Sequence, residues 1–136
     1  MRTISMIVVH CSDTEDGKNF TEKDIDRWHR AQGWAYGCGY HYVVQIDGTV
    51  ERGRPEDLKG AHVKDHNLHS IGVCYIGGKR DGVYADTRTE AQKQSMLALL
   101  KDLKRRFPNA IIVGHNTLNK NKACPCFDAY QEYKNI

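Results

Sequence analysis

The chain lacks any apolar run of membrane-spanning length, and its first residues, Met1 to Ser5, lack the apolar core of a signal peptide. We therefore expect a protein that is cytoplasmic as synthesised, does not bind membranes, and reaches any other compartment by a different route. Repeats, low-complexity segments and Pro/Gly/Ser-rich linkers are also missing. The 136 residues are thus expected to form one domain, 1–136, with a monomer as the default state.

Neither charge nor cysteine content is strongly biased. The 20 basic and 17 acidic side chains are interspersed and give a net charge of +3, so we expect no nucleic-acid partner. A weakly basic surface would suit a polyanionic cell-wall substrate equally well. The five cysteines are odd in number and scattered, which favours reduced thiols. Cys74 lies in an apolar run and is expected to be a core residue, and Cys11 and Cys38 could be the same.

Hydrophobic patterns predict alternating strands and helices. The expected strands are residues 5–10, 40–46, 49–54, 70–76 and 110–113. The expected helices lie between Thr21 and Gly33, between Thr89 and Pro108, and over 128–135. Strands interleaved with helices, with one hairpin at Asp47-Gly48, predict an α/β fold whose central mixed β-sheet is flanked by helices.

Local signals mark the ends of these elements. Thr21 with Asp24, and Thr89 with Gln92, have the spacing of helix-capping boxes. The second helix places apolar side chains at helical spacing on one face until Pro108. Gly77-Gly78 is expected to stop the fourth strand.

Two histidines end buried strands, and a cysteine follows the second of them. His10 and His115 each terminate an apolar run, and Cys124 comes nine residues after His115. Ends of strands open into the crevice where α/β sheets hold ligands. Three nitrogen and sulfur donors are the number that a catalytic zinc uses when it keeps a fourth position for water. We therefore predict a zinc hydrolase.

Each candidate also has a plainer interpretation. Either histidine could be a hydrogen-bonded residue at a sheet edge, and Cys126 is a rival ligand to Cys124. We prefer Cys124 because Lys122 is two residues before it, and alternate side chains of an extended loop face one side. An ammonium there could stabilise an oxyanion, although without a metal Lys122 would be read as a solvated lysine. Tyr40 could orient a water or transfer a proton, but alone it would be read as a core-edge aromatic.

These residues also carry a family resemblance. The blocks that carry it are Ile7-Val8-Val9-His10-Cys11-Ser12, Trp28-His29, Gly33-Trp34, Gly39-Tyr40-His41-Tyr42, Asp47-Gly48-Thr49-Val50-Glu51, Ala61-His62, Asn67, Ser70-Ile71-Gly72-Val73 and Lys122-Ala123-Cys124-Pro125-Cys126-Phe127-Asp128. In this order, over nearly the whole chain, they resemble the zinc-dependent N-acetylmuramoyl-L-alanine amidases. The nearest branch is the small bacteriophage lysozyme-type amidases, which are relatives of animal peptidoglycan recognition proteins.

The resemblance implies a mixed sheet with a zinc groove and hydrolysis of the amide between N-acetylmuramic acid and L-alanine in peptidoglycan. Position by position, His10, His115 and Cys124 match the family's zinc ligands. The catalytic tyrosine and lysine of the family fall on Tyr40 and Lys122. His62 and Asn67 fall in the block that lines the substrate groove. The implied cofactor is Zn²⁺, and the implied partner is the glycan-linked stem peptide.

The chain departs from the family pattern in its loops and its extent. Residues 116–121 lack the proline often found before the lysine, which puts the shape of that loop in doubt but leaves the ligand set intact. The segment before the first strand is too short for a regulatory arm, and we expect no separate wall-binding module.

Three other functions compete with a wall-degrading amidase. A peptidoglycan-binding module with little turnover would not need the intact ligands His10, His115 and Cys124. A cytoplasmic recycling amidase acting on soluble anhydro-muropeptides fits the missing signal peptide, but such enzymes resemble a lysine-x-aspartate pattern, whereas this chain has lysine-x-cysteine. A redox or structural-zinc protein using Cys124 and Cys126 would lack a second cysteine pair.

Overall fold

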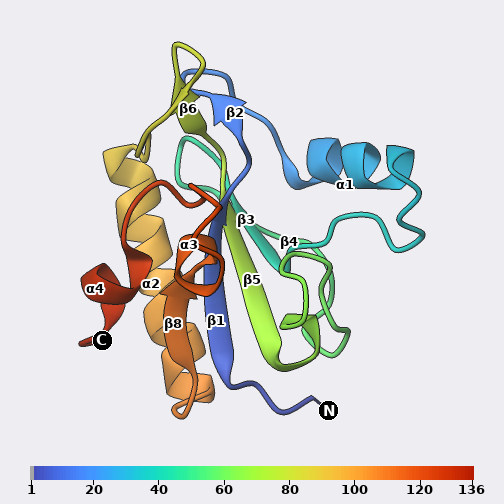
Figure 1. The fold of residues 1–136 in the computed structure, drawn as a ribbon, viewed down its shortest axis with the longest axis vertical. Helices are drawn as coiled ribbons and strands as arrows, with labels where there is room; N and C mark the ends of the chain where they lie inside the picture. The colour runs from blue at the N-terminus through green and yellow to red at the C-terminus, as the bar shows by residue number, and fades with distance from the viewer. Residues whose placement is uncertain (1) are drawn as a thin grey trace.

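A five-stranded mixed sheet forms the centre of the computed structural model, which describes residues 2–136 (Figure 1). Its strands lie in the order β4-β3-β5-β1-β8. The bounds are β1 (Met6–Cys11), β3 (Tyr42–Val44), β4 (Val50–Arg52), β5 (Ser70–Tyr75) and β8 (Ile111–Gly114). Neighbouring strands are parallel except β4, which pairs antiparallel with β3 through the Asp47-Gly48 turn. The predicted mixed sheet and hairpin are confirmed.

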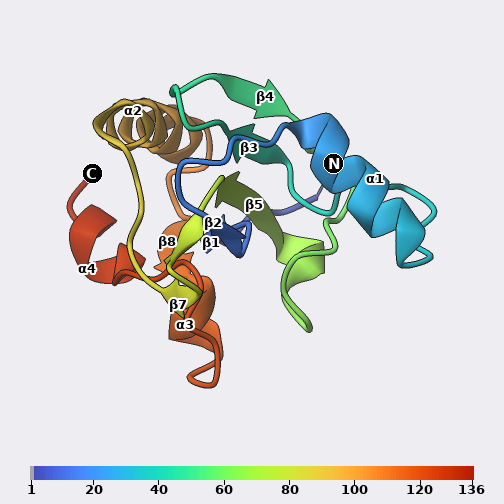
Figure 2. The ribbon, with the colours of Figure 1, turned by 90° about the horizontal axis from the view of Figure 1, so that it is seen from above.

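Helices cover both faces of this sheet. They are α1 (Glu22–Ala31), α2 (Glu90–Arg106), the short α3 (His115–Leu118) and α4 (Ala129–Tyr133), with a 3₁₀ turn, η1 (Asn67–His69), before β5. Both predicted capping boxes are present, at Thr21 with Asp24 and at Thr89 with Gln92. Seen from above, α2 and α4 lie on one side of the sheet and α1 on the other (Figure 2).

The alternation of side chains along each strand separates a core face from a site face. On the α2 side, Ile7, Val9, Ile71 and Val73 join one apolar cluster with Leu100 of α2. The intervening side chains of the same strands point to the opposite face. That face receives His10 from β1, Gly72 and Cys74 from β5, and Val43 from β3, and it is the face on which the candidate site is built.

Two features of the fold differ from the sequence-based expectations. A small second sheet joins β2 (Thr14–Glu15), β6 (Gly78–Arg80) and β7 (Val83–Tyr84). As expected, the fourth strand stops before Gly77-Gly78, since β5 ends at Tyr75. Gly78 in addition begins β6, because the left-handed backbone at Gly77 and Gly78 lets the chain turn directly into a new pairing. Strands of two or three residues carry too little hydrophobic pattern to be read from sequence.

The second difference lies at the ends of predicted strands. β3 begins at Tyr42, so Tyr40 precedes the strand that it was expected to open. His115 begins the short helix α3 where a loop was expected.

Among residues 2–136 there is no helix that is long and apolar enough to cross a membrane. The prediction of one domain over residues 1–136 stays a prediction.

Candidate metal centre and adjoining cavity

His10 stands at the end of β1 on the site face of the sheet. Only 1% of the residue is exposed. Its Nδ1 lies 3.8 Å from the Sγ of Cys124. Burial, reinforced by the neighbouring imidazoles of His62 and His115, holds the pKa of His10 well below its usual value. The ring is therefore neutral, which is the form that binds a metal.

His115 reaches the same place from the next strand. It follows β8, and the backbone amide of Gly114 donates to Thr117 Oγ1 (3.0 Å), which fixes the start of α3. The His115 and His10 rings have centroids 4.8 Å apart. Burial, together with the charge of Lys122, lowers the pKa of His115. This second imidazole is thus also held in its neutral form.

The loop that carries Cys124 is tied to the sheet by hydrogen bonds. The backbone amide of Asn116 donates to the Cys124 carbonyl (2.8 Å), and the Asn116 side chain donates to the carbonyl of Phe127 (3.2 Å). Tyr75, at the end of β5, donates its hydroxyl proton to the Pro125 carbonyl (2.7 Å). The backbone amide of Cys11 donates to Cys124 Sγ (3.1 Å), which fixes the thiol beside the end of β1.

These three side chains could hold one metal ion. One donor atom from each of His10, His115 and Cys124 lies within 4.8 Å of the other two. Two imidazole nitrogens and one thiolate suit zinc, and three protein ligands leave a coordination position for water or substrate. The residues present therefore fit a catalytic zinc site.

Cys126, the rival thiol, points elsewhere. Its backbone is left-handed, with φ of 73°. Its Sγ lies 3.9 Å from the Sγ of Cys11 and 3.3 Å from the carbonyl of Gly78. Cys126 is thus directed toward β6, whereas Cys124 is directed toward His10. The geometry favours Cys124 as the ligand, in agreement with the choice made from the sequence.

Tyr40 lies beside His10, in the segment before β3. The two rings have centroids 5.2 Å apart. Burial, with smaller contributions from nearby cysteines, raises the pKa of the Tyr40 phenol well above its usual value. The phenol is therefore protonated at neutral pH and is available as a hydrogen-bond donor beside His10.

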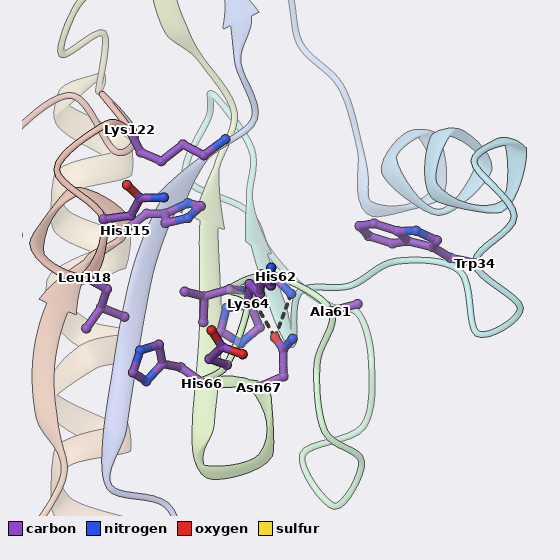
Figure 3. A pocket seen from close by; sticks show the side chains of 12 residues that line it. Trp34, Ala61, His62, Lys64, His66, Asn67, His115, Leu118 and Lys122 are labelled. Atoms are coloured by element: carbon purple, nitrogen blue, oxygen red, sulfur yellow. Dashed lines mark hydrogen bonds between the residues drawn. The ribbon is translucent and has the colours of Figure 1, made fainter.

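A cavity of about 750 Å³ opens in front of His115 (Figure 3). Lys122 and His115 lie on one side of it, and Trp34, from the loop after α1, lies on the other. Its remaining lining residues come mostly from the segment 61–67 and from α3 and the residue after it. The structure thus brings Lys122, an exposed side chain, and His115 to the wall of the same cavity.

His62 and Asn67, predicted to line the groove, both border this cavity. The Asn67 side-chain oxygen accepts from the backbone amides of His62 (2.8 Å) and Val63 (3.0 Å), so Asn67 also holds the loop in shape. The Nδ1 of His62 lies 2.8 Å from the Nε2 of His10. This contact was not foreseen, because the two histidines are 52 residues apart in the chain.

Trp34 also lines the cavity, and the sequence analysis assigned it no role. Its ring packs at 4.4 Å, between centroids, on the ring of His29 in α1 and remains 36% exposed. A tryptophan left partly open at a cavity wall can stack on a ligand. The sequence signal was its place directly after Gly33, at the end of the predicted helix, where a large aromatic projects from a loop.

This chain is similar to known amidases in sequence and in structure. Residues 1–127 match the protein family described as N-acetylmuramoyl-L-alanine amidase. The endolysin of Escherichia phage T7 is 43% identical over 123 residues, 90% of this chain and 80% of that protein. The endolysin of Klebsiella phage KP32 is 42% identical over 125 residues, 91% and 82% of the two chains. The solved structure of the amidase LysC from Clostridium intestinale superposes with a TM-score of 0.77 at 30% identity, covering 91% of this chain and 77% of LysC.

Proposed function

The chain belongs to the N-acetylmuramoyl-L-alanine amidase family, and from that premise we propose that it hydrolyses peptidoglycan with a zinc ion held by His10, His115 and Cys124. The reaction cleaves the amide between the lactyl group of N-acetylmuramic acid and the L-alanine of the stem peptide, as in a phage endolysin. The observation that carries the zinc assignment is the convergence of the three donor atoms within 4.8 Å of one another, at a group whose His115 also lines the cavity.

The metal and the cavity have separate tasks. When bound, zinc would supply a Lewis acid that polarises the scissile carbonyl and lowers the pKa of a coordinated water. The cavity holds the glycan-linked stem peptide so that its first amide lies against His115, with His62 and Asn67 among the residues that contact it. Trp34 on the opposite wall offers an aromatic face to the substrate.

Tyr40 positions the nucleophile. Its ring stands 5.2 Å from that of His10, between centroids, and its raised pKa keeps the phenol protonated. The hydroxyl can therefore orient a water by hydrogen bonding and pass a proton during attack on the amide carbon. A phenolate would not be available at neutral pH, so Tyr40 is not the initial base.

Lys122 stabilises the negative charge that develops on the carbonyl oxygen. After burial, the charge of Lys122 is the next cause of the lowered pKa of His115, which supports an electrostatic effect of the ammonium on the site. The amide oxygen of a substrate in the cavity would lie between this ammonium and the candidate metal position. Donors placed in advance of the reaction stabilise the transition state more than the ground state.

Digestion of purified peptidoglycan tests this function. We expect release of stem peptides that begin with a free L-alanine amine and no new reducing sugar ends, and loss of this release after chelation. Activity on soluble anhydro-muropeptides but not on intact sacculi would indicate a recycling amidase. Binding to sacculi without release would indicate a recognition module. Either result would contradict the proposal.

A further inference from the structure

The imidazole ring of His62 makes more hydrogen bonds within the protein than a residue that only contacts substrate would need. Its Nδ1 lies 2.8 Å from His10 Nε2, and its Nε2 lies 3.2 Å from Ser70 Oγ at the start of β5. Both ring nitrogens are therefore engaged within the protein. A histidine reserved for substrate would leave at least one nitrogen directed at the cavity.

Two glycines make room for this ring. A Cβ atom placed on Gly72 would lie 2.7 Å from the Cγ and Cδ2 of His62. A Cβ atom placed on Gly60 would meet the same ring edge. Gly72 pairs in register with Val8 on β1, two residues before His10. The fold thus provides a fitted space for the imidazole directly beside His10.

The hydrogen bonds of these residues can run in two directions. If His10 donates from Nε2 to His62, His62 donates from Nε2 to Ser70, and His10 Nδ1 keeps its lone pair facing Cys124. If instead Ser70 donates to His62, His62 donates from Nδ1 to His10, and the proton of His10 lies on Nδ1. Only the first direction leaves His10 able to bind a metal beside Cys124 Sγ, which is 3.8 Å from that nitrogen.

We propose that His62 is a positioning residue for the metal centre: its Nδ1 accepts the Nε2 proton of His10 and thereby presents the Nδ1 of His10 to the metal. The proposal rests on the zinc site proposed above. Hydrogen-bonded partners of metal-binding histidines fix the tautomer and the ring orientation of the ligand, and their loss weakens metal binding by about 10- to 100-fold. Here the partner is a neutral imidazole, with Ser70 fixing its far end.

The tautomer of His10 in the metal-free protein is the first test. Nitrogen-15 NMR of the imidazole rings separates a protonated from an unprotonated nitrogen without any substitution. We expect His10 to be protonated on Nε2 and unprotonated on Nδ1. A proton on Nδ1 in the folded, metal-free protein would overturn the proposal. A role of His62 in packing alone would not select either tautomer.

The second test is zinc affinity, measured by competition between the protein and a chromophoric chelator for Zn²⁺. We expect His62→Leu to weaken binding by about 10- to 100-fold. His62→Asn, whose side-chain oxygen can reach the position of Nδ1, should recover most of the loss. His69→Leu is the matched control, because His69 lies outside the cavity and contacts His66 rather than His10, and it should leave the affinity unchanged.

The outcomes separate this inference from the function on which it rests. Failure of the unsubstituted protein to bind Zn²⁺ would contradict the proposed zinc site. Tight binding by the unsubstituted protein and equally tight binding by His62→Leu would contradict the role of His62 alone. If His62→Leu does not fold, which thermal unfolding of the metal-free variant would show, the tautomer of His10 in the unsubstituted protein still decides.

Discussion

Arg88 is predicted to contribute more to stability than any surface ion pair. Its side chain is 3% exposed, although it carries a full charge. It donates to both oxygens of Asp86 and to both oxygens of Glu132, at 2.7 to 2.9 Å. The guanidinium also lies 3.4 Å from the centre of the Phe127 ring. Arg88 therefore joins the segment before α2 to the C-terminal segment that follows Cys124.

The cost of removing this guanidinium can be bounded. Hydrogen bonds to charged groups are worth about 1.5–3 kcal/mol each, but four of them do not add because both carboxylates regain water. Side-chain exposures of 32% for Asp86 and 43% for Glu132 ensure that neither carboxylate would be stranded in the core. We therefore expect Arg88→Met, which keeps the aliphatic stem, to lower the free energy of unfolding by about 2–4 kcal/mol.

Urea denaturation of the metal-free protein measures this difference. The matched control is Arg80→Met, because Arg80 pairs with Asp16 at 2.7 Å while its own side chain is 56% exposed. That pair should contribute less than about 1 kcal/mol. Zinc affinity is a second readout. It should fall in Arg88→Met, since Phe127 follows Cys124 by three residues, and it should not change in Arg80→Met. Equal losses of stability in the two variants would refute the reasoning.

Three further predictions concern the site and its surroundings. Lys122→Ala should retain zinc but slow turnover by about two to three orders of magnitude, the usual loss for one oxyanion stabiliser, and a near-normal rate would contradict its role. Cys124→Ser should abolish zinc retention and activity while Cys126→Ser leaves both largely intact, and equal losses would show that the wrong thiol was chosen. Burial lowers the pKa of His41 to about 4. As the pH falls, His41 is protonated in the unfolded state at a higher pH than in the folded state. The stability that neutral His41 confers is therefore complete above about pH 6.5 and is lost as the pH falls toward 4. An NMR titration that gives an ordinary histidine pKa for His41 would refute this.

Local patterns in the sequence were enough to predict much of the sheet and both long helices. The capping boxes at Thr21 and Thr89 and the turn at Asp47-Gly48 each depend on residues within a few positions of one another, so they are present in the structure as predicted. The ends of β1 and β8 could also be predicted, because the apolar runs that stop at His10 and His115 can be recognised without knowing which strands pair with them.

Contacts between distant segments could not be predicted in the same way. The approach of His62 to His10 spans 52 residues, and the bond from Arg88 to Glu132 spans 44. Nothing near either residue in the sequence specifies its partner, since the contact arises only after β1 and β5 pair and after the C-terminal segment packs beside α2. The grouping of His10 and His115 was predicted because strand ends that meet at one edge of a sheet limit where their side chains can lie. Cys124 was added because of its spacing from Lys122 and because of the family resemblance.

The set of atoms that hold the metal is the central feature of the proposed site. Zinc content of the purified protein, combined with X-ray absorption at the zinc edge, would measure both the stoichiometry and the ligands. We predict one zinc per chain, with one sulfur at about 2.3 Å and two imidazole nitrogens at about 2.0–2.1 Å, and loss of the sulfur contribution in Cys124→Ser. A protein that releases stem peptides from peptidoglycan without zinc, or a zinc site with no sulfur ligand, would contradict the account.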